Sequence, residues 1–291
     1  MITGFQTVLV VASKEILDHL RSKRMYVIGG LYALTLLIAA LLVPRIFPAE
    51  ALAAEDRIPT VLGYYFQFIG FTFTSLLAIV VVADALCGEW KDRSLVLLFS
   101  KPVSRRAVLA GKVFGAYASV VLMFAVVLVL GIVVLMVAYG LPSAEGWGRI
   151  LGGLGFSLVA LVPFIALGTL TTALFKTPMT SFLVAIGAKF LLFPALSTIG
   201  IILAFASGIE AGPEAVNEGV VFFFTHVDPD NLLDRASSIF TGTGDAINFL
   251  GFGGSGRSQE ELLSWAFLAI VVHSVLYFTP AFWLVGKRDY P

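Results

Sequence analysis

Six long apolar runs constrain the fold of this chain more than any other feature of its sequence. They cover residues 26–43, 61–86, 113–139, 150–175, 179–206 and 262–285. A helix needs about 20 mostly apolar residues to cross the hydrocarbon core of a bilayer. Charged residues make up 13% of the chain, about half of their share in soluble domains. We therefore predict an all-α integral membrane protein, in which residues 1–291 form a single domain built as a six-helix transmembrane bundle.

The segment 5–24, which precedes the first run, has the periodicity of an amphipathic helix. Its apolar side chains recur at helical spacing, and its charged side chains lie on the opposite side. The apolar set is Phe5, Leu9, Ala12, Ile16 and Leu20, and the charged set is Lys14, Asp18 and Arg21. This pattern is typical of a helix that lies in the plane of the membrane interface. We therefore predict an interfacial N-terminal helix.

Two prolines lie inside predicted spans, Pro163 in the fourth and Pro194 in the fifth. A proline removes one helical hydrogen bond, and its ring clashes with the preceding turn. We expect both helices to kink or break at these positions.

The basic residues that flank the runs are divided unequally. Thirteen Lys and Arg residues lie on the side of the two termini and the segment 88–112, and five lie on the other side. Basic residues collect on the cytoplasmic side of membrane proteins. We therefore predict a multi-pass protein of the cell membrane with both termini in the cytoplasm. The charged segment 88–112 would lie in cytoplasmic water, and the acidic loop 207–261 would be external.

The sequence lacks the motifs that would make this chain an enzyme. It contains no phosphate-binding loop of the G-x-x-x-x-G-K-[ST] type and no H-E-x-x-H zinc motif. His226, Asp228, Asp230 and Asp234 cluster in the external loop and could ligate a cation, but this stretch also reads as a turn followed by a capped helix. We favour the turn. We expect no catalytic activity, no metal or cofactor in this chain, and no nucleic-acid partner.

Lys189 is a charged residue inside the fifth predicted span. It lies about eleven residues, or ~16 Å at 1.5 Å per residue, from the start of that run. A charge at this depth is costly and usually faces protein or a water-filled path, which favours a role in a substrate path. The alternative is a structural lysine that bonds to backbone carbonyls freed near Pro194 or extends toward an interface.

The segment 88–112 holds six of the nineteen Lys and Arg residues and carries the most specific pattern. Residues 86–115 read LCGEWKDRSLVLLFSKPVSRRAVLAGKVFG. This run resembles the loop between the second and third helices of ABC-2 type transporter permeases, although Arg93 and Ser94 stand where that family often has Gly-Thr. The matching positions are Glu89, Arg93, Ser94, Leu95, Leu97, Leu98, Ser100, Pro102, Val103, Ser104, Arg105, Gly111 and Lys112. The chain length and the long loop before the last helix resemble the branch that includes the nitrous-oxide reductase maturation permeases.

The order of residues in this segment suits contact with a soluble partner. Residues 94–100 can form one or two helical turns with an apolar face, which can dock in a groove of another protein. Pro102 ends these turns, and Ser104 can cap the helix that follows. The alternative is an ordinary cytoplasmic loop that sets the topology and contacts anionic lipid.

The resemblance implies a permease subunit of an ATP-binding-cassette exporter that moves its substrate by alternating access. Separate ABC ATPase subunits would hold ATP and Mg²⁺, and a second permease copy, identical or related, would complete the complex within the membrane lipid. The residues expected to contact the ATPase are Glu89, Arg93, Leu95, Leu98, Phe99, Pro102 and Arg105. Two alternatives remain: an ion-coupled secondary transporter with Lys189 as the coupling charge, or a non-transporting membrane scaffold or sensor that uses the external loop.

Overall fold

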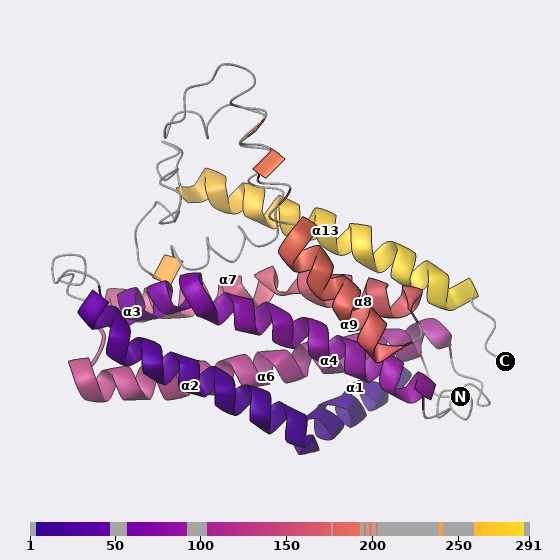
Figure 1. The fold of residues 1–291 in the computed structure, drawn as a ribbon, viewed down its shortest axis with the longest axis horizontal. Helices are drawn as coiled ribbons and strands as arrows, with labels where there is room; N and C mark the ends of the chain where they lie inside the picture. Colours follow the sequence, from indigo (N-terminus) through magenta and orange to yellow (C-terminus); the bar gives the residue numbers. More distant parts are fainter. Residues whose placement is uncertain are drawn as a thin grey trace.

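The fold is all-helical in the computed structural model of the chain (Figure 1). The structure describes residues 4–46, 57–91, 104–175, 177–192 and 259–287, with short pieces at 195, 198–199, 202 and 239–240. Almost all of these residues are helical, and none of them lies in a β-strand. The predicted all-α class is therefore confirmed.

Long helices run side by side along the bundle, and α1 lies at the lower right of the view, next to the start of α2 (Figure 1). On the right of Figure 1, α4 ends, α6 begins and α13 ends at the same end of the bundle. The elements are α1 Gly4–Arg21, α2 Lys23–Ile46, α3 Arg57–Tyr65, the π-helix η1 Phe66–Gly70, α4 Phe71–Lys91, α6 Arg105–Tyr139, α7 Ala144–Ala160, α8 Val162–Leu174, α9 Pro178–Gly187, the π-helix η2 Ala188–Leu192 and α13 Gln259–Lys287.

Four helical stretches of the described residues are long and apolar enough to cross a membrane. They are Met25–Arg45, Arg105–Tyr139, Ala144–Leu174 and Leu263–Lys287, which correspond to the first, third, fourth and sixth predicted spans. The second and fifth predicted spans correspond to shorter apolar helices, Phe71–Ala83 and Pro178–Leu191. A π-helix precedes the first of these and ends the second, so the regular helix is shorter than the apolar run. The count of six crossings stays a prediction.

The fourth predicted span breaks next to Pro163, as expected. α7 ends at Ala160, and α8 begins with Pro163 in its first turn. A proline costs little there, because the first N–H groups of a helix have no partner inside it. Pro194 lies outside the described residues.

The central helix is α8, against which α4, α9 and α13 pack. Its buried hydroxyl groups bond to carbonyl oxygens of the same helix. Thr169 donates to Ile165 at 2.7 Å, and Thr172 donates to Thr169 at 2.8 Å. A hydroxyl without a partner is costly in an apolar interior, so these bonds let α8 carry polar residues inside the bundle.

A second set of hydroxyl groups joins α2 to the start of α4. The Tyr32 and Thr74 hydroxyl oxygens lie 2.7 Å apart, and Thr74 donates to the carbonyl oxygen of Gly70 at 2.7 Å. Gly70 ends the π-helix η1, and a Cβ atom at this position would lie 2.5 Å from Cδ1 of Phe66. Irregular backbone inside a membrane is tolerated where protein groups satisfy its hydrogen bonds. The threonine provides such a group for η1.

Candidate functional site

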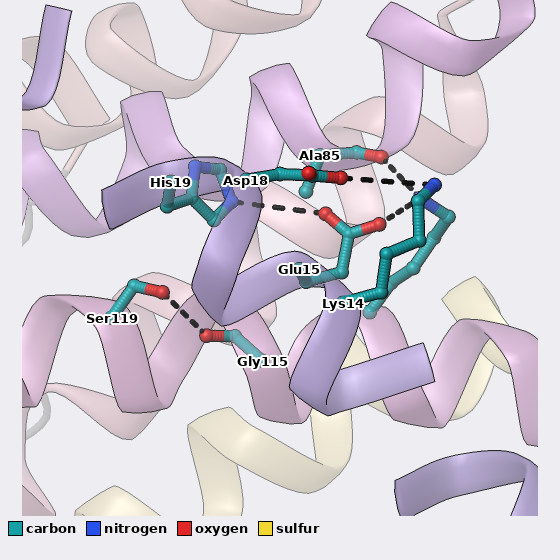
Figure 2. Close-up of polar contacts among 8 residues, drawn as sticks. Lys14, Glu15, Asp18, His19, Ala85, Gly115 and Ser119 are labelled. Atoms are coloured by element: carbon teal, nitrogen blue, oxygen red, sulfur yellow. Dashed lines mark hydrogen bonds and ion pairs between the residues drawn. The ribbon is translucent and has the colours of Figure 1, made fainter. Parts of the chain in front are cut away.

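Gly111 and Gly115 of α6 let α1 approach the α6 backbone very closely. A Cβ atom at Gly111 would lie 2.8 Å from the carbonyl oxygen of Val8, and one at Gly115 would lie 2.6 Å from Cβ of Glu15. Ser119 lies one turn further along α6 and donates to the carbonyl oxygen of Gly115 at 2.8 Å (Figure 2). Small residues at this four-residue spacing bring membrane helices into backbone contact. α1 is therefore held tightly against α6.

The predicted N-terminal helix is present as α1, which ends at Arg21, three residues before the expected end, and its place in the membrane interface stays a prediction. The buried residues of α1 are Thr7, Ala12, Glu15 and His19, and the residues of α1 that lie closest to Gly111 and Gly115 of α6 are Val8, Val11, Ala12 and Glu15. Several of the apolar side chains are exposed, including Phe5, Leu9, Leu17 and Leu20. The side of α1 toward α6 thus includes a small side chain, Ala12, and a polar one, Glu15. It lies between the apolar face and the charged face of the helix.

Lys112 of α6 forms a buried ion pair with Glu15 of α1. The lysine Nζ lies 2.5 Å from Oε1 of Glu15 and donates to the carbonyl oxygen of Ala85 in α4 at 2.8 Å. Lys112 is 2% exposed and Glu15 is 4% exposed. The other carboxylate oxygen of Glu15 lies 3.8 Å from Nε2 of His19. Figure 2 shows Glu15 on α1 between His19 and Ala85.

One ammonium group therefore joins three helices, and we call Glu15, Ala85 and Lys112 the three-helix junction. Ala85 lies six residues before the end of α4 at Lys91, and Lys112 lies seven residues after the start of α6 at Arg105. The segment 92–103 connects these two helices, so the junction lies close to both ends of this segment. Removing one partner of a buried ion pair typically costs about 3–5 kcal/mol, because a charge is left uncompensated.

The burial of Lys112 contradicts the expectation that the basic residues of the segment 88–112 all lie in water. α6 begins at Arg105, well before the apolar run starts, and α1 covers this first part of it. The carboxylate of Glu15 replaces water around the ammonium group. The signal in the sequence was the pair of glycines on either side of Lys112, which the charge count did not use.

The structure describes only part of the set predicted to contact an ATPase. Glu89 lies in the last turn of α4, and Arg105 is the first residue of α6 and half-buried. Ser104 caps α6 as predicted, since its hydroxyl accepts a hydrogen bond from the amide of Ala107 at 3.5 Å. The other members, Arg93, Leu95, Leu98, Phe99 and Pro102, lie outside the described residues.

The loop 207–261, which was predicted to be external, also lies largely outside the described residues, with His226, Asp228, Asp230 and Asp234. Among the residues that the structure does describe, no group of three or more His, Cys, Asp or Glu side chains could hold a metal ion. A metal site at His226, Asp228, Asp230 and Asp234 therefore stays untested.

Lys189 lies in the π-helix η2 and is 2% exposed. Its Nζ lies 5.0 Å from the ring centroid of Phe164 in α8 and 5.5 Å from that of Phe190. Aromatic faces attract a cation at such distances, more strongly away from water. The side chain thus faces protein inside the bundle, and its role in a substrate path stays a prediction.

A family model described as "ABC-2 family transporter protein" matches residues 9–289. The matched region includes the three-helix junction, Lys189 and the whole of α13. No curated protein matches the chain.

Proposed function

The chain belongs to the ABC-2 transporter family, and from this we propose that it is the permease subunit of an ATP-binding-cassette exporter. The family match over almost the whole chain is the observation that carries the proposal. The four stretches of spanning length among the described residues agree with a protein that crosses the membrane several times. In this proposal separate ATPase subunits bind ATP and Mg²⁺, and a second permease copy completes the transport path.

The segment 88–112 is proposed to receive the motion of the ATPase. α4 ends at Lys91 and α6 begins at Arg105, both within this segment, and Lys112 bonds to both α4 and α1. A displacement of this segment would therefore move three helices together. The glycine contacts of Gly111 and Gly115 support this, because they leave no space for α1 to slide on α6.

Deleting residues 94–99 is expected to abolish co-purification of the ATPase subunit with the tagged permease. The charge reversal Glu89→Lys with Arg93→Glu is expected to weaken the same contact, since opposed charges fix the register of an interface. The measurements are the amount of ATPase subunit that co-purifies and the ATP hydrolysis rate of the complex. Retention of both at wild-type levels would show that this segment is not the contact.

A matched control is the exchange of Glu145 and Arg149, which form an ion pair one turn apart on α7. The variant Glu145→Arg with Arg149→Glu changes as many charges, and it preserves a pair far from the segment 88–112 in the chain. Co-purification is expected to be unchanged. If the control loses as much co-purified ATPase subunit as the variant Glu89→Lys with Arg93→Glu, the loss would indicate a general effect of charge on the complex.

Lys189→Met is expected to preserve assembly and to abolish transport, because the variant keeps the volume of the side chain and removes its charge. The measurements are co-purification of the ATPase subunit and rescue of a strain that lacks the permease. Leu191→Met, at an exposed neighbouring position, is the control and should rescue fully. Full rescue by Lys189→Met would exclude a role in the substrate path, and loss of assembly would assign Lys189 a structural role.

A further inference from the structure

The start of α6 and the end of α13 bring two basic side chains and a tryptophan together. The guanidinium group of Arg106 lies against Gly286, where a Cβ atom would be only 3.3 Å from its Nε. The next residue, Lys287, holds its Nζ 4.2 Å from the ring centroid of Trp283. Both helix ends lie at the right of the bundle in Figure 1. We call Arg106, Trp283 and Lys287 the α6–α13 basic cluster.

The length of α13 places this cluster near the lipid headgroups. Its candidate span Leu263–Lys287 has 25 residues, or ~37 Å at 1.5 Å per residue. The hydrocarbon core is ~30 Å thick, and the headgroup regions extend the bilayer to ~40–45 Å. A centred span thus has its last turn at headgroup depth. Trp283 is 52% exposed, as is typical of tryptophans that lie at a membrane interface.

The cluster carries positive charge that the described part of the chain does not neutralise. Among the described residues, neither Arg106 nor Lys287 forms an ion pair with a carboxylate. Arg106 also lies in the first turn of α6, where the helix end has a partial positive charge that disfavours a cation. An anion beside the cluster would balance both the charge of the two side chains and the partial positive charge of the helix end.

We propose that the α6–α13 basic cluster binds the headgroup of an anionic phospholipid. The phosphate would lie between the Arg106 guanidinium, which can donate two parallel hydrogen bonds to it, and the Lys287 ammonium. The acyl chains would follow the exposed side chains of Val272 and Leu276, which share one side of α13 with Trp283. The site requires only that α6 and α13 span the membrane, so it does not depend on the transport function proposed above.

The test measures the melting temperature of the purified chain in detergent while lipid is added. The probes are phosphatidylglycerol, phosphatidylcholine and glycerol 3-phosphate. We expect phosphatidylglycerol alone to stabilise the wild type. Arg106→Gln with Lys287→Gln should weaken this binding about 25-fold, since each basic residue near an anionic surface contributes a factor of about 5. Both side chains are exposed, so stability without lipid should be unchanged.

The control is Lys14→Gln, which removes an exposed charge that pairs with Asp18 at 3.8 Å. It should leave phosphatidylglycerol binding within about twofold of wild type. The proposal is wrong if the double variant binds phosphatidylglycerol as the wild type does, or if Lys14→Gln weakens binding equally. Equal stabilisation by phosphatidylcholine would also overturn it. If glycerol 3-phosphate stabilises the wild type but not the double variant, the ligand of the cluster is a free phosphate compound instead of a lipid.

Discussion

Gly115→Leu is expected to separate α1 from α6 and to lower the melting temperature of the protein by roughly 5–10 °C. A Cβ atom at this position would lie 2.6 Å from Cβ of Glu15 and 2.8 Å from the carbonyl oxygen of Ala12. Backbone atoms cannot move aside as the end of a flexible side chain can. Overpacking of this kind costs about 3 kcal/mol, which corresponds to a shift of several degrees in a protein of this size.

Gly115→Ala should show a smaller effect in the same direction, since its Cβ atom alone already meets α1. Gly155→Leu is the matched control, because Gly155 also lies within a helix, in α7, but has no neighbouring atom within 4 Å of its Cβ position. Its melting temperature should stay close to that of the wild type. Equal shifts for Gly115→Leu and Gly155→Leu would mean that the α1–α6 contact does not limit stability.

The same substitution tests whether α1 takes part in coupling. If α1 and the start of α6 move as one body, Gly115→Leu should also reduce the ATP hydrolysis rate of the complex relative to Gly155→Leu. A variant that is destabilised but hydrolyses ATP at the control rate would restrict α1 to a structural role. The measurement uses the purified complex below the melting temperature of the weaker variant.

Local sequence signals predicted the local features of this fold well. Apolar runs located the helices, Pro163 located the break between α7 and α8, and Ser104 was recognised as the cap of α6. Each of these features depends on residues within one or two helical turns, so the sequence around it contains the cause. The π-helices η1 and η2 were not predicted, because apolar runs do not distinguish α from π geometry.

The three-helix junction could not be predicted by the same reasoning. Lys112 and Glu15 are 97 positions apart in the sequence. The count of basic residues that predicts topology treats every lysine and arginine outside a span as solvated, and so it placed Lys112 in water. Burial of a lysine depends on whether a carboxylate can reach it, which in turn depends on the close approach of α1 at Gly111 and Gly115. The small-residue spacing around Lys112 indicates a helix contact, but it does not identify α1 as the partner.

Lys112→Met is expected to destabilise the protein by about 3–5 kcal/mol, because it leaves the buried carboxylate of Glu15 without its ammonium partner. It also removes the donor to the carbonyl oxygen of Ala85. Lys14→Met is the matched control, since Lys14 forms an exposed ion pair with Asp18 on α1, and such pairs contribute about 0.2–1 kcal/mol. Thermal unfolding of both variants, side by side, provides the comparison.

The double variant Lys112→Met with Glu15→Leu separates stability from coupling. An apolar pair of similar volume can replace a buried ion pair at little cost, so the double variant should recover most of the stability lost in Lys112→Met. We expect its ATP hydrolysis rate in the complex to remain low, because the Ala85 carbonyl still lacks its donor and the polar link from Lys112 to α4 and α1 is missing. If hydrolysis recovers together with stability, the ammonium group stabilises the fold without relaying motion. If stability does not recover, the cost of Lys112→Met does not come from the unpaired carboxylate.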